Sequence, residues 1–130
     1  MTVDEFRRLA LALHGAVEGA HMGHPDFRAN GRIFASLLPD KHLGTVMITP
    51  EEQAELMKES PATFFPCSGA WGRAGSTHVR LNDAADEATV RAALTLAFER
   101  AVSKPAPRVR GGSRTTTRPR AQRGRSKKKT

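Results

Sequence analysis

The sequence has no tyrosine, one tryptophan and one cysteine, and aromatic residues make up only 5% of its 130 positions. A single cysteine forms no disulfide within the chain, which is typical of a reducing compartment. No uncharged apolar run reaches the roughly 18 residues that a membrane-spanning helix needs. The first residues also lack the cationic stretch and apolar run of a signal peptide. We therefore expect an intracellular, cytoplasmic protein with no membrane partner.

Carboxylates are absent from the C-terminal part of the chain. Residues 103–130 contain eleven of the 21 Lys and Arg residues and no Asp or Glu, so the formal net charge of +8 divides into +11 for this segment and −3 for residues 1–102. A segment of this charge density binds polyanions by counterion release, without reading a sequence. Its only large aliphatic residue is Val109, so we expect it to be disordered. The chain thus predicts one domain, residues 1–102, and a disordered basic tail, residues 103–130.

Signatures of common enzymes are missing as well. The chain contains no G-x-x-x-x-G-K-[ST] loop, no G-x-S-x-G elbow and no H-E-x-x-H motif. Cys67 has no partner at a spacing typical of an activated nucleophile. His21 and His24 are not accompanied by the paired ligands, such as C-x-x-C, of structural zinc sites. We expect neither catalysis nor a metal ion or other cofactor.

Capping signals and apolar spacing predict three helices. Thr2 and Glu5 form a capping box before a helix over residues 3–14. Thr49 precedes Pro50, which suits the first position of a helix that continues to residue 60. The third and longest helix starts at Asp86 and ends before the Lys-Pro pair at residues 104–105.

Between these helices the apolar period changes to two, which indicates strands. Asn30-Gly31 predicts a type I′ hairpin turn, in a register that places Phe27 opposite Phe34. Further strands are predicted over residues 45–48 and 77–81, with a short edge strand over residues 19–22. The predicted fold is α+β, an antiparallel sheet of four to five strands with helices packed on one face.

Two segments resemble a known family. They are H-P-D-F-R-A-N-G-R-I-F-A at residues 24–35 and G-A-W-G-R-A-G-S-T at residues 69–77. With the helix start at Thr49, they are similar to the MmcQ/YjbR family over about residues 2–102. The resemblance implies a small α+β domain, similar to the secretion-chaperone and CyaY-like folds, and a protein of a family usually described as DNA-binding. Members commonly carry an aromatic residue where this chain has Ser76, so we assign no stacking role to that position.

Trp71 and Arg73 lie in a glycine-rich segment that we expect to be a loop. An exposed indole beside a guanidinium can stack on a base and hold a phosphate. Alternatively, Trp71 folds back as a lid on the core, while the glycines let the chain turn sharply. Because tryptophan is highly buried on average, we predict the lid and regard Arg73 as the better candidate for a contact.

Arginines also flank the hairpin turn and lie on the polar face of the last strand. Arg28, Arg32 and Arg80 can track a phosphate backbone from one sheet face, as sheet and ribbon readers do. They can equally belong to the solvent-exposed face of a sheet whose other face is buried. The charge of −3 on residues 1–102 favours the second interpretation.

The predicted function is non-enzymatic binding of nucleic acid, DNA rather than RNA, in the cytoplasm or on the nucleoid. The alternative is a peptide-binding or chaperone-like module, and a small-molecule site under the tryptophan segment is a third hypothesis. The candidate contacts to nucleic acid are Arg28, Arg32, Trp71, Arg73 and Arg80 in the domain, and Arg108, Arg110, Arg114, Arg118, Arg120, Arg123, Arg125, Lys127, Lys128 and Lys129 in the tail.

Overall fold

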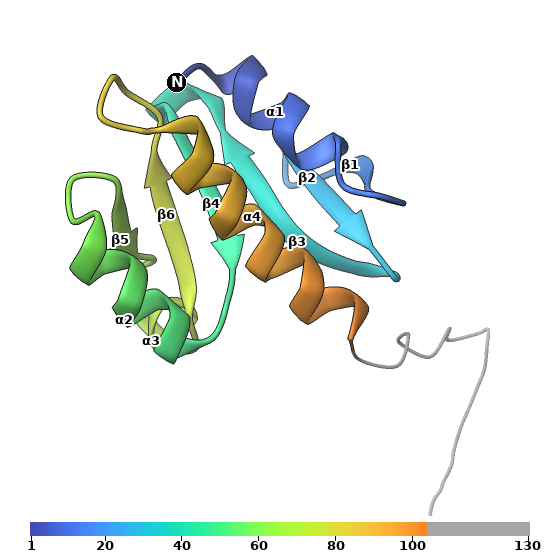
Figure 1. Cartoon of the computed structure of the whole chain (residues 1–130). Coiled ribbons are helices and arrows are strands. Elements are labelled where there is room, and N and C mark those ends of the chain that lie inside the picture. Colours follow the sequence, from blue (N-terminus) through green and yellow to red (C-terminus); the bar gives the residue numbers. More distant parts are fainter. Residues whose placement is uncertain (104–130) are drawn as a thin grey trace, which may run out of the picture.

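The computed structural model describes residues 1–103 (Figure 1), so the predicted disorder and the candidate contacts from residue 108 onward lie outside the described residues. The elements along the chain are α1 (Val3–Leu11), β1 (Val17–His21), β2 (His24–Ala29), β3 (Arg32–Leu38), the 3-10 helix η1 (Pro39–Lys41), β4 (Leu43–Met47), α2 (Pro50–Glu59), β5 (Phe64–Pro66), α3 (Gly69–Arg73), β6 (Ser76–Arg80) and α4 (Glu87–Val102).

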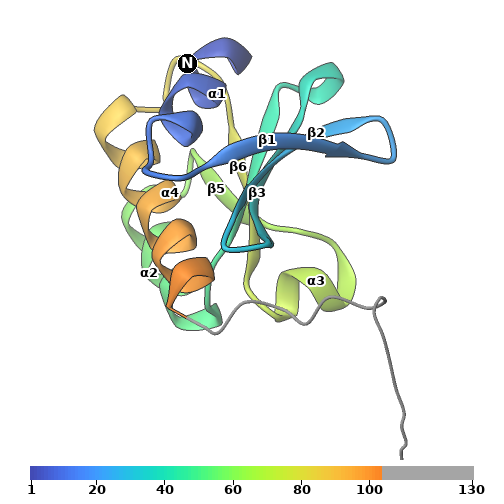
Figure 2. The ribbon, with the colours of Figure 1, turned by 90° about the vertical axis from the view of Figure 1, so that its right-hand side faces the viewer.

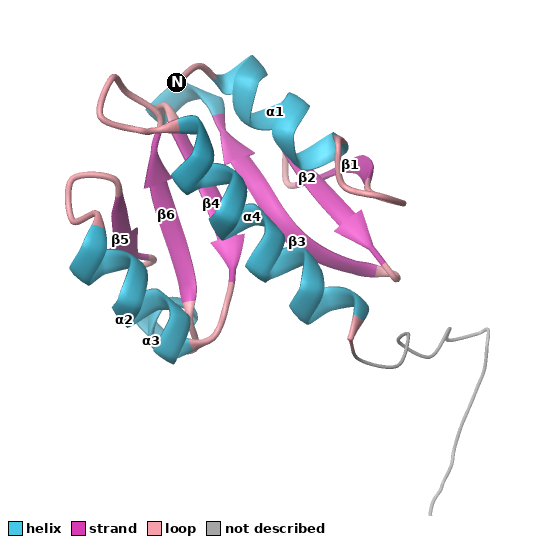
Figure 3. Cartoon of the chain, in the orientation of Figure 1, coloured by secondary structure: helices cyan, strands magenta, loops and turns pink. Residues whose placement is uncertain are grey.

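The strands form one antiparallel sheet of six, in the order β1-β2-β3-β4-β6-β5 (Figure 3). The α+β class is confirmed, and β1 is the predicted edge strand. The predicted four to five strands were too few, because three-residue β5 is too short to show a period of two. Helices α1, α2 and α4 cover one face of the sheet, and short α3 lies on the other side at its lower end (Figure 2).

The predicted helix starts are confirmed by their caps. Thr2 Oγ1 accepts the Glu5 N–H at 3.1 Å, and Glu5 accepts the Thr2 N–H at 2.7 Å. Thr49 and Glu52 repeat this capping box at 3.1 and 3.0 Å. Asp86 accepts the Thr89 N–H at 3.0 Å at the start of α4. Each box satisfies amides that the first helical turn would leave unpaired, so these starts follow from local sequence.

The Asn30-Gly31 hairpin is confirmed, but its predicted register is wrong. Both turn residues have positive φ, 56° and 72°, as a type I′ turn requires. A bulge then shifts the pairing, so that Phe27 lies opposite Ala35 and not opposite Phe34. The Phe34 ring packs edge-on against Phe98 of α4, with 5.7 Å between ring centroids. Phe27 and Phe34 are both fully buried, and the bulge adds Ala35 to the core beside Phe34.

The core lies between the sheet and the three long helices. Phe6 of α1 is fully buried and lies 6.2 Å, centroid to centroid, from Phe27 of β2. A Cβ built on Gly44 of β4 would lie only 2.5 Å from the Phe6 ring, so a glycine is needed where α1 crosses this strand. Val90 and Leu94 of α4 complete the buried layer. This packing leaves the opposite face of the sheet available for other chemistry.

Candidate nucleic-acid interface

The face of the sheet turned away from α1 and α4 carries a polar row. Because Phe6 packs on Gly44, the next residue, Thr45, faces the other way. Strand pairing extends this position into a row across all six strands, formed by Gly19, Asp26, Ser36, Thr45, His78 and Phe65. The long helices leave this face of the sheet uncovered (Figure 2). The polar side chains in the middle of the row, Asp26, Ser36 and Thr45, are nevertheless buried.

Arg28 is held by a buried carboxylate in this row. Asp26 is fully buried, and it accepts hydrogen bonds from Arg28 Nε at 2.7 Å and Nη2 at 3.0 Å. His21 Nδ1 lies 2.8 Å from the same carboxylate. Hydrogen bonding by Arg28 lowers the pKa of Asp26, and the carboxylate in turn raises the pKa of Arg28. Gly19 leaves room for the pair, since a Cβ there would lie 3.1 Å from Asp26 Oδ1. The charge of Arg28 is therefore compensated within the domain.

Arg80 is also engaged inside the domain. Its guanidinium carbon lies 4.2 Å from the centroid of the Phe65 ring, a cation–π contact, and Nη1 donates to the Pro61 and Ala62 carbonyls at 3.3 Å. The same Phe65 ring lies 5.0 Å from the His78 ring. The Phe65 ring is thus contacted by both Arg80 and His78, and the two carbonyl hydrogen bonds hold Arg80 against the loop before β5.

His78 lies between strands in a half-buried position. Its Nδ1 is 3.1 Å from Thr45 Oγ1 on the neighbouring strand. Burial lowers the pKa of His78; a hydrogen bond with the Gly44 backbone opposes this shift in part, and Lys41 adds a smaller contribution in the lowering direction. The imidazole is consequently neutral at pH 7 and adds no cationic charge to the polar row.

Trp71 is exposed, so the predicted lid is wrong. The segment is the short helix α3, not a loop, and 74% of the Trp71 surface is accessible. The inward side of α3 is Gly72, where an added Cβ would lie 1.8 Å from the Cys67 carbonyl oxygen. Gln53 of α2 donates to the Gly72 carbonyl at 3.0 Å and so ties α3 to the domain. Packing of Gly72 turns Trp71 outward, with exposed Arg73 on the same short helix.

The five predicted domain residues do not form one patch. Arg28 and Arg80 share a sheet face but lie three strand spacings apart, roughly 14 Å across the sheet. They also lie at different levels along the strands, since Arg28 is in register with Ile33 of β3 and Arg80, through Leu43, with Leu38. Arg32 pairs in register with Ala29 and lines a cavity of about 200 Å³ beside Arg100 near the end of α4. Trp71 and Arg73 are brought together on α3. Only this last pair is both clustered and exposed.

Sequence reasoning missed the roles of Asp26, His21 and Gln53. Asp26 and Arg28 are two residues apart on a strand, so they share a face, and this spacing was a usable signal. No local pattern marks Gln53, which also donates to the Ser76 carbonyl and Thr77 Oγ1 at 3.1 Å. Ser76 itself is buried and donates to Met47 Sδ at 3.3 Å, so it packs between strands.

Comparison with known proteins identifies the family. The sequence model of the YjbR family matches residues 11–100. The chain belongs to the YjbR family. The crystal structure of Deinococcus radiodurans protein DR2400, which carries a DUF419 domain, aligns with a TM-score of 0.63 and 17% identity over 87% of this chain and 95% of that one. At this identity the likeness supports the fold alone. A search of curated proteins found no match.

Within residues 1–103, no three His, Cys, Asp or Glu residues are grouped so that they can hold a metal ion. Burial raises the pKa of the Cys67 thiol, which keeps it protonated at neutral pH. None of the described helices is both long and apolar enough to cross a membrane.

The fluorescence of Trp71 tests directly whether its side chain is exposed in this YjbR protein. We expect the emission of the free chain to be red-shifted, as for an indole in water, because 74% of the side chain is accessible. Trp71→Ala should change the free energy of unfolding by no more than about 0.5 kcal/mol, as exposed substitutions usually do. A blue-shifted emission, or a loss of stability typical of a core tryptophan, would place the indole against the core after all.

The half-buried His78 predicts a pH dependence of stability. Its pKa in the folded state is lowered from the ordinary 6.5, so as pH falls through 6.5 the unfolded chain binds a proton that the folded chain does not. The free energy of unfolding should therefore decrease from pH 7 toward pH 5. In His78→Gln, where an amide still reaches Thr45, this slope should be smaller in urea unfolding at several pH values. Equal slopes would exclude His78 as the cause. The lowered pKa of Asp26 acts in a separate window, below about pH 4.

Proposed function

We propose that this chain is a non-enzymatic nucleic-acid-binding protein, acting on DNA in the cytoplasm or on the nucleoid, in which the basic tail supplies most of the affinity. The observation that carries the proposal is the division of charge. Eleven cations and no carboxylate lie in residues 103–130, beside a domain of net −3. Counterion release then favours binding of the tail to any nucleic acid, and the net charge of the domain opposes it.

The interactions of the domain arginines support this assignment of roles. Arg28 is compensated by buried Asp26, and Arg80 is held on Phe65. Neither is positioned as a free phosphate contact. The remaining contribution of the domain comes from α3, where exposed Trp71 can stack on an unpaired base and Arg73 can contact the adjacent phosphate. In this arrangement the tail attracts nucleic acid and α3 orients the domain on it.

A peptide-binding module is the second candidate, favoured by an apolar groove between α2 and α4. The two functions are separated by a fluorescence-anisotropy titration of the full chain with a labelled DNA duplex at several salt concentrations. Affinity that falls steeply with salt supports nucleic-acid binding through the tail. Absence of binding even at low salt contradicts it and favours the peptide module.

A further inference from the structure

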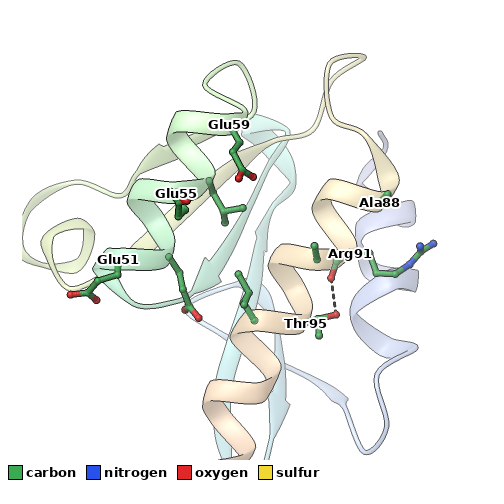
Figure 4. A pocket seen from close by; sticks show the side chains of 10 residues that line it. Glu51, Glu55, Glu59, Ala88, Arg91 and Thr95 are labelled. Atoms are coloured by element: carbon green, nitrogen blue, oxygen red, sulfur yellow. Dashed lines mark hydrogen bonds between the residues drawn. The ribbon is translucent and has the colours of Figure 1, made fainter.

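The groove between α2 and α4 lies on the outer surface of the helical layer. Its volume is about 690 Å³, and its surface is mainly apolar. Leu56 of α2 and Ala88, Ala92 and Leu96 of α4 contribute the apolar lining. Figure 4 shows the groove between the two helices. The two helices come from parts of the chain about 30 residues apart, so their packing on the sheet creates the groove. It is separate from the polar row and from α3.

The α2 side of this groove is acidic. Glu51, Glu52, Glu55 and Glu59 all line it. Carboxylates four residues apart on a helix repel one another, and Glu59 lies at the C-terminal end, where the helix dipole disfavours negative charge. Lys58, in the last turn of α2, lies three residues after Glu55, but no ion pair joins it to Glu55 or Glu59 in the described residues, so the helix itself offsets little of their charge. A cationic occupant of the groove would stabilise both.

The nearest cation on α4 does not neutralise this side. Arg91 pairs with Glu87 of its own helix, and Figure 4 shows its side chain directed away from α2, toward α1. Glu52 is used in the capping box with Thr49. Among the described residues, no cation forms an ion pair with Glu55 or Glu59. The groove thus combines an apolar floor with uncompensated negative charge.

We propose that the groove binds the chain's own basic tail. Complementary charge is the first argument, because the tail has eleven cations and no carboxylate. Arginine also suits the floor, since its aliphatic stem packs on apolar side chains while the guanidinium reaches a carboxylate. The tail therefore matches both parts of the groove, its acidic side and its apolar floor.

Connectivity is the second argument. The tail follows α4 directly, and Leu96 in the groove is only six residues before Val102, about 9 Å along the helix. The 27 residues after Ser103 can span at most roughly 90 Å when extended, so they can reach every part of the groove. The effective concentration of the tail at the groove is then high.

Docking of the tail goes beyond the proposed function, because it is a contact within the free protein. It would make the groove and a nucleic acid compete for the same cations. The contact is measured without nucleic acid, so its failure leaves the proposed function untouched, and the reverse also holds.

Paramagnetic relaxation measured by NMR on the full chain tests the contact. A spin label is attached at Ser113→Cys in a Cys67→Ser background. At low ionic strength, amide signals of α2 and of residues 88–96 should broaden, while those of the β1–β2 hairpin should not. At about 0.5 M salt, where exposed charges are screened, the signals should recover. No broadening, or broadening centred on another surface, would overturn the proposal and leave the groove to an external partner.

Two matched variants test the role of the glutamates. Glu55→Gln/Glu59→Gln should remove at least about half of the broadening, because these are the uncompensated carboxylates of the groove. Asp40→Asn/Asp83→Asn makes the same change of net charge at exposed positions outside the groove and should leave the broadening unchanged. If both variants lose the same amount of broadening, the tail is attracted by the net negative charge of the domain and not by the groove. Broadening of an unlabelled chain mixed with a spin-labelled one would assign the groove to the tail of a second copy. Either result overturns the proposal.

Discussion

A chain cut after Ser103 should lose most of its affinity for duplex DNA and most of the salt dependence of that affinity. If about half of the eleven tail cations contact phosphates, the logarithm of the binding constant of the full chain should fall with the logarithm of salt concentration with a slope of roughly −5. The truncated chain keeps only a domain of net negative charge, which DNA repels at long range. We expect its slope to lie near −1 or to be unmeasurable, because Arg73 is the one predicted arginine left uncompensated and exposed.

The cut is placed after Ser103 because this residue caps α4. Its N–H donates to the Glu99 carbonyl at 2.9 Å, and its Oγ donates to the Arg100 carbonyl at 3.1 Å. Every buried hydrophobic residue of the described core lies between Phe6 and Ala101, so the truncated chain keeps the whole core. An unchanged melting temperature is the control for folding. Anisotropy titrations of both chains with one duplex at several salt concentrations give the two slopes. Equal slopes would show that the tail does not supply the salt-dependent affinity.

Features that depend on neighbouring residues were predictable from the sequence. The helix starts at Thr2, Thr49 and Asp86 need only a side-chain acceptor within the first turn. The Asn30-Gly31 turn needs only residues that tolerate positive φ. The starts of the three long helices and the hairpin turn therefore follow from short segments of sequence.

Features decided by packing between distant segments were not predictable in the same way. The bulge in β3 accompanies the packing of Phe34 against Phe98 of α4, which comes from a distant part of the chain. The exposure of Trp71 depends on Gly72 meeting the Cys67 backbone and on Gln53 reaching across from α2. In both cases the sequence shows aromatic and glycine residues, while the contact that orients them comes from another element.

The same distinction applies to the candidate site. The sequence alone gives the charge of the tail, since this needs only a count of its charged residues. It does not show that Arg28 is compensated, because that depends on Asp26 being buried beneath it, with His21 arriving from another strand. Nor does the sequence reveal the acidic groove, whose two walls are joined only in the folded chain. The proposed roles of the tail and of α3 therefore rest on both the sequence and the fold.

Substitution of Gly75, which joins α3 to β6, should have the largest effect on stability. Its φ is +115°, and a Cβ would lie 1.9 Å from the Ile48 carbonyl oxygen and 2.9 Å from its carbon. Both atoms belong to backbone at the end of β4, where Met47 pairs with Ser76, so they can move only if the strands separate. We expect Gly75→Ala to lower the free energy of unfolding by about 3 to 5 kcal/mol, at the upper end for a single substitution.

Gly69→Ala is the matched control, because Gly69 also has positive φ, +66°, but has nothing within 4 Å of an added Cβ. It should cost only about 1 kcal/mol, the backbone strain of a left-handed alanine. Urea unfolding of the two variants and the parent measures the difference, which isolates the steric contribution at Gly75. If both variants lose the same stability, the ends of β4 and β6 adjust freely. In that case the close contact of Gly75 with the Ile48 backbone would not be what holds α3 to the end of β4, and the contacts of Gly72 and Gln53 alone would orient Trp71.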